Sequence, residues 1–232
     1  MSQIIAPISE ALQAMIAGFT EGNPEVNAEE GQNVLSSLVT LMGHSSEFPS
    51  KLKELDAIFD AHPAFEPLYH YLFDLLMLSF IASDANAMDE QYLESEEWLK
   101  IEEETSDQGS ELLNLYIYLQ EAVAEEVRVN LDDYLREFLL ADDDLYQDDF
   151  FIYEEILKKE DMEEAGIEDI LDMARHSESP ELEEVMVPML AFFCRQDSRE
   201  TIEQALKNDG SKGLHLALYK TIHGFYHGLK ES

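Results

Sequence analysis

Three histidines and a tyrosine near the C-terminus have the spacing of one helix face. His215, Tyr219, His223 and His227 follow one another at intervals of four residues. Two imidazoles four residues apart can bind one metal ion, so His223 and His227 are candidate ligands that would need a further ligand from elsewhere. The sequence contains no HExxH or Glu-x-x-His motif. The alternative, which we favour, is a half-buried stripe that packs on neighbouring helices.

A second histidine has a carboxylate on each side of it. Glu66, His70 and Asp74 are also four residues apart, which places them on one face of a helix. Flanking carboxylates raise the pKa of an imidazole and can prepare it for acid–base chemistry, or the group could bind a metal. Because no nucleophile pattern accompanies them, we favour the view that they mark the solvent side of an apolar helix. His70, Asp74, His223 and His227 together form the alternative metal-site hypothesis.

A dense run of carboxylates raises the possibility of calcium binding. The run consists of Asp142, Asp143, Asp144, Asp148 and Asp149. An EF-hand loop that began at Asp142 would have Gln147 where glycine is required and Tyr153 where glutamate is required. The calcium motif therefore fails, and two interpretations remain: an acid-rich helix start or a docking patch.

Another acidic pair has the position of a helix start. Asn130 can cap a helix whose first turn carries Asp132 and Asp133, where the positive end of the helix dipole favours acids. Such acids can also contact a basic partner. Asp132 and Asp133, with the five aspartates of 142–149, are the predicted partner-binding residues.

Two further side chains are weaker candidates. Cys194 closes the apolar run MLAFFC and is expected to act as a small apolar residue, since only Arg195 is nearby in sequence to lower the pKa of its thiol. Trp98 lies among glutamates and could anchor a partner, although a core contact is the more ordinary role. The sequence has neither a GxGxxG nor a Walker A phosphate loop.

Helical periodicity positions all of these residues. Apolar residues recur every three or four positions along most of the chain, and no segment alternates in the manner of a strand. Breaks are expected at Gly22–Pro24, Gly43, His62–Pro63 and Asn208–Gly210. Residues 64–83 are apolar almost all round, which predicts a central buried helix. A further stripe runs from Leu112 to Val127, and Asp197 with Glu200 resembles a capping box.

These patterns predict an all-α fold. We expect about ten to twelve helices in stacked antiparallel helical hairpins, as a bundle or a short α-solenoid-like array. Residues 1–232 are interpreted as a single domain. A possible subdivision into 1–105 and 106–232 lies at the polar stretch EEETSDQGS, residues 102–110.

The charge is concentrated in the middle of this chain. The net charge is −37, from 51 acidic and 14 basic residues, and residues 84–172 alone carry 31 acids and five bases. Such a surface disfavours a nucleic-acid binder, and no apolar run is long enough for a membrane span. One cysteine cannot form an internal disulfide. Because Glu10 interrupts the first apolar run and no basic residue precedes it, we expect no secretory signal and a cytoplasmic location.

The leading functional prediction is a non-enzymatic interaction protein. The acidic region 84–172 would engage a basic protein partner, in the manner of an inhibitor, adaptor or chaperone, and no cofactor is predicted. One alternative is a metal-dependent helical enzyme that uses the His and carboxylate clusters. Another is a structural or homo-oligomeric helical protein, and plain solubility would also account for the acids.

Overall fold

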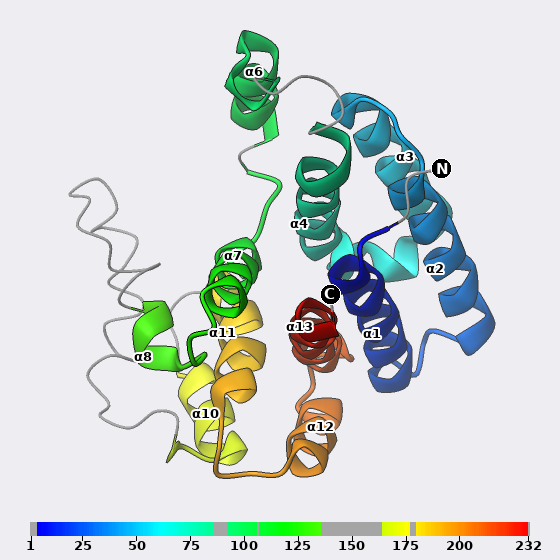
Figure 1. The fold of residues 1–232 in the computed structure, drawn as a ribbon. Helices are drawn as coiled ribbons and strands as arrows, with labels where there is room; N and C mark the ends of the chain where they lie inside the picture. The colour runs from blue at the N-terminus through cyan, green and yellow to red at the C-terminus, as the bar shows by residue number, and fades with distance from the viewer. Residues whose placement is uncertain (1–3, 86–91, 106, 136–163, 177–179, 232) are drawn as a thin grey trace.

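The fold is all-helical, as the periodicity predicts. A computed structural model describes residues 4–85, 92–105, 107–135, 164–176 and 180–231 (Figure 1). These residues form eleven α-helices and three shorter 3-10 or π turns, and they include no strand. Among them no helix has both the length and the apolarity to cross a membrane. The α-helices are α1 (Ala6–Gly22), α2 (Ala28–Gly43), α3 (Phe48–Ala61), α4 (Tyr69–Phe80), α6 (Glu96–Thr105), α7 (Leu112–Ala124), α8 (Leu131–Tyr134), α10 (Ile167–Ala174), α11 (Pro180–Phe193), α12 (Arg199–Asn208) and α13 (Leu214–Glu231).

The first and last α-helices form the centre of the molecule. α1 and α13 run antiparallel and so close together that a Cβ atom on Gly18 would lie 2.8 Å from Cα of Ala217. At the other end of the pair, a Cβ atom on Gly228 would lie 2.6 Å from Cα of Pro7. Only glycine permits this backbone approach, because any side chain would occupy the space of the facing helix.

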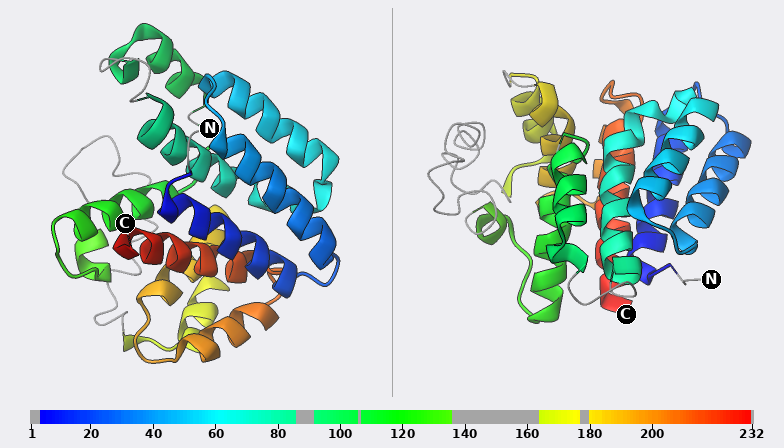
Figure 2. Two further views of the ribbon diagram at one scale, coloured as in Figure 1. Left: turned by 45° about the vertical axis from the view of Figure 1, so that its right-hand side comes forward. Right: turned by 90° about the horizontal axis from the view of Figure 1, so that it is seen from above.

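The other helices pack on the two sides of this central pair. In the right-hand view of Figure 2, α7 and α11 lie on one side of α13, while α1, α2 and α3 lie on the other. The buried apolar side chains form one cluster that extends from Ile8 to Phe225. At the edge of this arrangement, α6 lies away from α1 and α13, beyond the ends of α3 and α4 (Figure 1).

The apolar segment 64–83 is buried but is divided into parts. Pro63–Leu68 forms a 3-10 turn (η1), α4 follows, and Ile81–Ala85 forms a π turn (η2). The prediction of one continuous helix is therefore wrong, since Pro67 has no backbone N–H to donate inside an α-helix. Every residue from Tyr71 to Phe80 is buried, so the prediction of a central buried helix is confirmed.

Local capping fixes several helix boundaries. Asn27 accepts a hydrogen bond from the N–H of Glu30 at the start of α2, and Asn130 caps α8 as predicted. At the end of α2, the buried Lys51 donates from Nζ to the carbonyls of Leu41 and His44, at 3.2 and 2.7 Å. This ammonium satisfies carbonyls that have no partner inside their own helix.

Three sequence predictions about boundaries need correction. The capping box at Asp197 is wrong, because Ser198 is the N-cap of α12 and Asp197 instead accepts the N–H of Ile167, 2.7 Å away, at the start of α10. Helix α7 ends at Ala124, so Val127 lies beyond it and is exposed. The polar stretch 102–110 is not all linker, since its first four residues form the last turn of α6.

Candidate functional site

The structure separates the Glu66, His70 and Asp74 group. Glu66 is exposed in η1, and His70 uses Nδ1 to contact the carbonyl oxygen of Gln108 at 2.9 Å. Asp74 is fully buried, and its Oδ1 accepts the N–H of Ser110 at 3.0 Å while its Oδ2 lies 2.5 Å from the Ser110 hydroxyl. His70 and Asp74 therefore attach the loop between α6 and α7 to α4, and the two carboxylates do not flank the imidazole.

The surroundings of Asp74 favour its neutral form. Burial raises the pKa of this carboxyl to about 8, although the hydrogen bonds from Ser110 act in the opposite direction. The hydroxyl of Tyr116 is completely buried near Asp74, and it has no hydrogen-bond partner among the residues that the structure describes. Tyr71 donates to Glu184 at 3.3 Å. A neutral carboxylic acid could donate a proton, but here both of its oxygens contact the loop.

The C-terminal histidines face different neighbours. His215 contacts Asp209, with 2.7 Å between Nδ1 and Oδ2, and His227 contacts Glu10 on α1. His223 lies between two aromatic rings, with centroid distances of 4.6 Å to Tyr219 and 5.0 Å to Phe192. Within the described part of the chain, His70, Asp74, His223 and His227 do not gather into a shared metal cluster.

Burial controls the chemistry of His223. It lowers the pKa of this imidazole to about 4, and the nearby Arg199 acts in the same direction. His223 is therefore neutral at pH 7, and its Nε2 is buried without a hydrogen-bond partner from the described residues. The predicted half-buried stripe agrees with this environment, since His223 contacts rings on its own helix and on α11.

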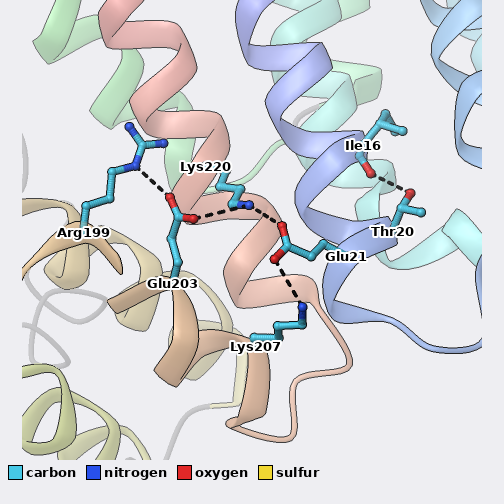
Figure 3. A network of polar contacts seen from close by, with 7 residues as sticks. All are labelled: Ile16, Thr20, Glu21, Arg199, Glu203, Lys207 and Lys220. Carbon is cyan, nitrogen blue, oxygen red and sulfur yellow. Dashed lines mark hydrogen bonds and ion pairs between the residues drawn. The ribbon is translucent and has the colours of Figure 1, made fainter. Parts of the chain in front are cut away.

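A network of alternating charges joins α1, α12 and α13 near the C-terminal end of α1 (Figure 3). Lys220 on α13 lies 2.6 Å from Oε2 of Glu21 on α1 and 3.5 Å from Oε2 of Glu203 on α12. Lys207 contacts the second oxygen of Glu21 at 3.2 Å, and Arg199 contacts Glu203 at 2.7 Å. The hydrogen bond from Lys220 is the main reason that the pKa of Glu21 lies below its usual range.

This network was not predictable from residue spacing. Only the pair Arg199 and Glu203 has helical spacing, whereas Lys220 and Glu21 are 199 residues apart. A hollow of about 390 Å³ borders the network and is lined by Glu21, Arg199, Glu200, Glu203, Gln204 and Lys207. Because its bases already contact acids, the network joins α1, α12 and α13 and offers no free cation for an anionic ligand.

A larger hollow lies between α10 and α12. Its volume is about 940 Å³, and Glu168, Asp169, Glu200 and Arg175 are among its lining residues. Two other lining carboxylates already have partners: Asp197 accepts the N–H of Ile167, and Asp209 contacts His215. The charged residues of the lining are mostly acidic, which suits a cationic group better than an anionic one.

The predicted acidic patch is described only in part. Asp132 and Asp133 are exposed in the first turn of α8, where Asp133 also contacts the capping Asn130. The aspartates of 142–149 lie outside the residues that the structure describes. Residue spacing therefore predicted the exposed acidic turn, but the relation of this turn to the second acidic run stays a prediction.

The acidic helix α6 exposes an apolar side chain next to a buried one. Trp98 is only 1% exposed and stacks on Phe80 at 5.4 Å, so its predicted core role is confirmed. The next residue, Leu99, is 54% exposed, and Leu93 just before the helix is 37% exposed. The sequence signal was the tryptophan–leucine pair, because neighbouring residues on a helix point in different directions and only one of them can face the core.

Cys194 is half-buried at the end of α11. Its thiol donates to the carbonyl of Ala165, with 3.1 Å between Sγ and the oxygen. This contact attaches the segment before α10 to α11. Cys194 also packs against the core, as expected for a small apolar residue.

No protein-family model, curated protein or solved structure matches this chain. The case for function therefore depends on the chemistry of the molecule itself.

Proposed function

We propose that this chain is a non-enzymatic interaction protein that binds a basic amphipathic segment of a partner protein on the outer face of α6. The observation that carries the proposal is the exposed Leu99 in the middle of a strongly acidic helix. An apolar anchor surrounded by carboxylates is complementary to an apolar side chain surrounded by lysines or arginines.

The charge around α6 is strongly one-sided. Residues 92–135 contain thirteen acids and only two bases, Lys100 and Arg128. Lys100 lies 3.4 Å from Glu104, where both side chains are well exposed, so the pair contributes little to stability. This surface would attract a basic partner from a distance, and its binding would weaken as salt increases.

The two faces of α6 have different surroundings. On the inner face, Trp98 and Ile101 are buried, and the indole N–H donates to Glu102 at 2.6 Å. On the outer face, Glu96 and Glu103 lie three residues before and four residues after Leu99, so they surround it on the helix surface. The core contacts hold the helix in place and leave Leu99 exposed to solvent.

The alternative of a metal-dependent enzyme has less support. Its four residues have separate neighbours in the described part of the chain: the α6–α7 loop for His70 and Asp74, aromatic rings for His223 and Glu10 for His227. A shared metal site needs these four residues to converge, and within the described residues they do not.

The test uses two labelled synthetic peptides of equal charge. One is an amphipathic helix of lysine and leucine, and in the other each leucine is replaced by serine. We expect tighter binding of the leucine peptide to the wild type, measured by fluorescence anisotropy. Leu99→Ser should lower the affinity for the leucine peptide about tenfold and leave the affinity for the serine peptide unchanged. The double variant Glu96→Gln and Glu103→Gln should lower the affinity for both peptides and reduce the salt dependence of binding.

Matched controls lie on α2. Val39 is 37% exposed, so Val39→Ser removes an exposed apolar side chain from another surface, and Glu29→Gln removes an exposed acid. Both variants should bind the two peptides as the wild type does. Equal affinity of wild type and Leu99→Ser for the leucine peptide, or equal loss in the α2 variants, would overturn the proposal.

A further inference from the structure

A histidine and two glutamates lie close together where the C-terminal end of α13 packs beside the first half of α1. His227 and Glu231 lie in the last turns of α13, and Glu10 lies in the first half of α1. Their nearest nitrogen and oxygen atoms all lie within 4.8 Å of one another. In the part of the chain that the structure describes, this is the one group of three or more side chains able to hold a metal ion.

The two carboxylates contact different sides of the imidazole. Nδ1 of His227 lies 2.6 Å from Oε2 of Glu10, which is a short, charge-assisted hydrogen bond. This contact places the ring proton on Nδ1 and leaves the lone pair of Nε2 free. A carboxylate in this position is the usual orienting partner of a metal-binding histidine.

The other nitrogen has the geometry of a ligand. Nε2 of His227 lies 3.6 Å from Oε1 of Glu231, which is too long for a hydrogen bond. Two ligands at about 2.0–2.1 Å from a tetrahedral zinc ion are themselves about 3.3 Å apart. A small rotation of the exposed Glu231 side chain would therefore close the pair around an ion.

The local charge also favours a cation. Glu10 and Glu231 both contact His227, and among the described residues neither of them has an ion pair with a lysine or arginine. The site lies at the C-terminal end of α13, where the helix dipole favours positive charge. His227 is 63% exposed, so an ion from solution can reach Nε2.

We propose that His227 and Glu231 bind a divalent transition metal such as Zn²⁺, with Glu10 as the positioning residue that holds the imidazole. One imidazole nitrogen and one carboxylate oxygen suit zinc, and the remaining coordination positions are open to water or to a donor from another molecule. This site differs from the His223 and His227 pair considered from sequence, because His223 is buried between aromatic rings. It is also independent of the surface on α6.

The first experiment titrates zinc into the tag-free full-length chain. Acidic proteins bind zinc at several weak sites, so the response of individual imidazoles is read in long-range ¹H–¹⁵N spectra, with the signals of His227 identified from their loss in His227→Gln. We expect zinc to shift Nε2 of His227, while Mg²⁺ leaves it unchanged, because magnesium prefers oxygen ligands. Unchanged His227 signals in the presence of zinc would mean that the group is an ion pair only, and would overturn the proposal.

Variants separate the roles of the three residues. In calorimetric titrations His227→Gln should lose one binding site, Glu231→Gln should weaken that site at least tenfold, and Glu10→Ala should weaken it by about 10–100-fold. The control is His176→Gln, which removes another exposed histidine, one whose Nδ1 contacts a backbone carbonyl. Since His227 and Glu231 are exposed, their variants should keep the wild-type circular dichroism. A His227→Gln protein with the stoichiometry and affinity of the wild type would contradict the proposal.

Discussion

Helix α13 lies at the centre of the molecule and α6 at its edge, and their charged residues have different surroundings. Lys220 on α13 is only 15% exposed and contacts two carboxylates from other helices. On α6, the single base Lys100 is 70% exposed and contacts an acid of its own helix. In the central region acids and bases connect helices, whereas around α6 the acids exceed the bases and face solvent.

This difference shows why a net charge of −37 says little by itself about function. Acids that contact a base from another helix contribute to the tertiary structure, and they are not available to a partner. Around α6, exposed acids lie beside the exposed Leu99, and this is the surface that we propose for recognition. The location of the few bases therefore distinguishes the two regions better than the number of acids.

The largest expected effect comes from removing the Trp98 side chain, which attaches α6 to the core. Trp98→Ala should reduce the local stability of this helix by about 3–5 kcal/mol, because Trp98 contacts Phe48, Phe80 and Tyr92 in the core. Hydrogen–deuterium exchange should show faster exchange in 96–105 and little change in α13. Leu99→Ala is the control and should stay within about 0.5 kcal/mol of wild type. Equal loss of protection in α13 would mean that α6 belongs to the central unit.

The next effect concerns the contact between α4 and the loop that follows α6, and it depends on pH. The ordinary pKa of an aspartate is 3.8, and that of the folded Asp74 is about 8, so the folded state holds a proton that the unfolded state releases between these values. Stability should therefore fall as pH rises through this window, by at most about 1.4 kcal/mol per pH unit. Asp74→Asn keeps the hydrogen bonds of the neutral acid and should lose this dependence.

The measurement is urea unfolding of both proteins at several pH values. From about pH 5 to pH 7 the wild type should lose about 3 kcal/mol relative to Asp74→Asn. His223, whose pKa is lowered to about 4, has the opposite effect, since stability is lost as pH falls below about 6.5. This contribution cancels when the two proteins are compared. Parallel stability profiles would show that Asp74 is ionised in the folded protein.

The smallest of the three effects tests the central pair. Gly18→Val should destabilise the protein by about 1–3 kcal/mol, because its side chain would meet the backbone of Ala217. Ala17→Val is a matched control on the exposed face of α1 and has the same β-branched cost in a helix. Urea unfolding of both variants gives the difference. If they are equally stable, α1 and α13 can separate without cost, and the centre is no tighter than the edge.

Much of the local structure was predictable from residue patterns. The cap at Asn130 follows from contacts within a few residues, and the burial of Tyr71–Phe80 was expected from apolar residues on every side of the segment. Prediction failed where a local pattern had two possible partners. Asp197 resembles a cap for the helix that follows it, yet it caps α10, thirty residues earlier in the chain.

The candidate sites were less predictable than the helices that carry them. The sequence placed His227 on a helix face, but only the fold brings Glu10 to it across 217 residues. In the same way, Asp74 meets Ser110 across 36 residues, and Lys220 meets Glu21 across 199. Helical periodicity is a property of neighbouring residues, so the sequence by itself determined the fold class, the inner faces and the charge map. Contacts between side chains depend on how helices pack, so only the tertiary structure decided that Asp74 is buried and which acids are paired with bases of other helices.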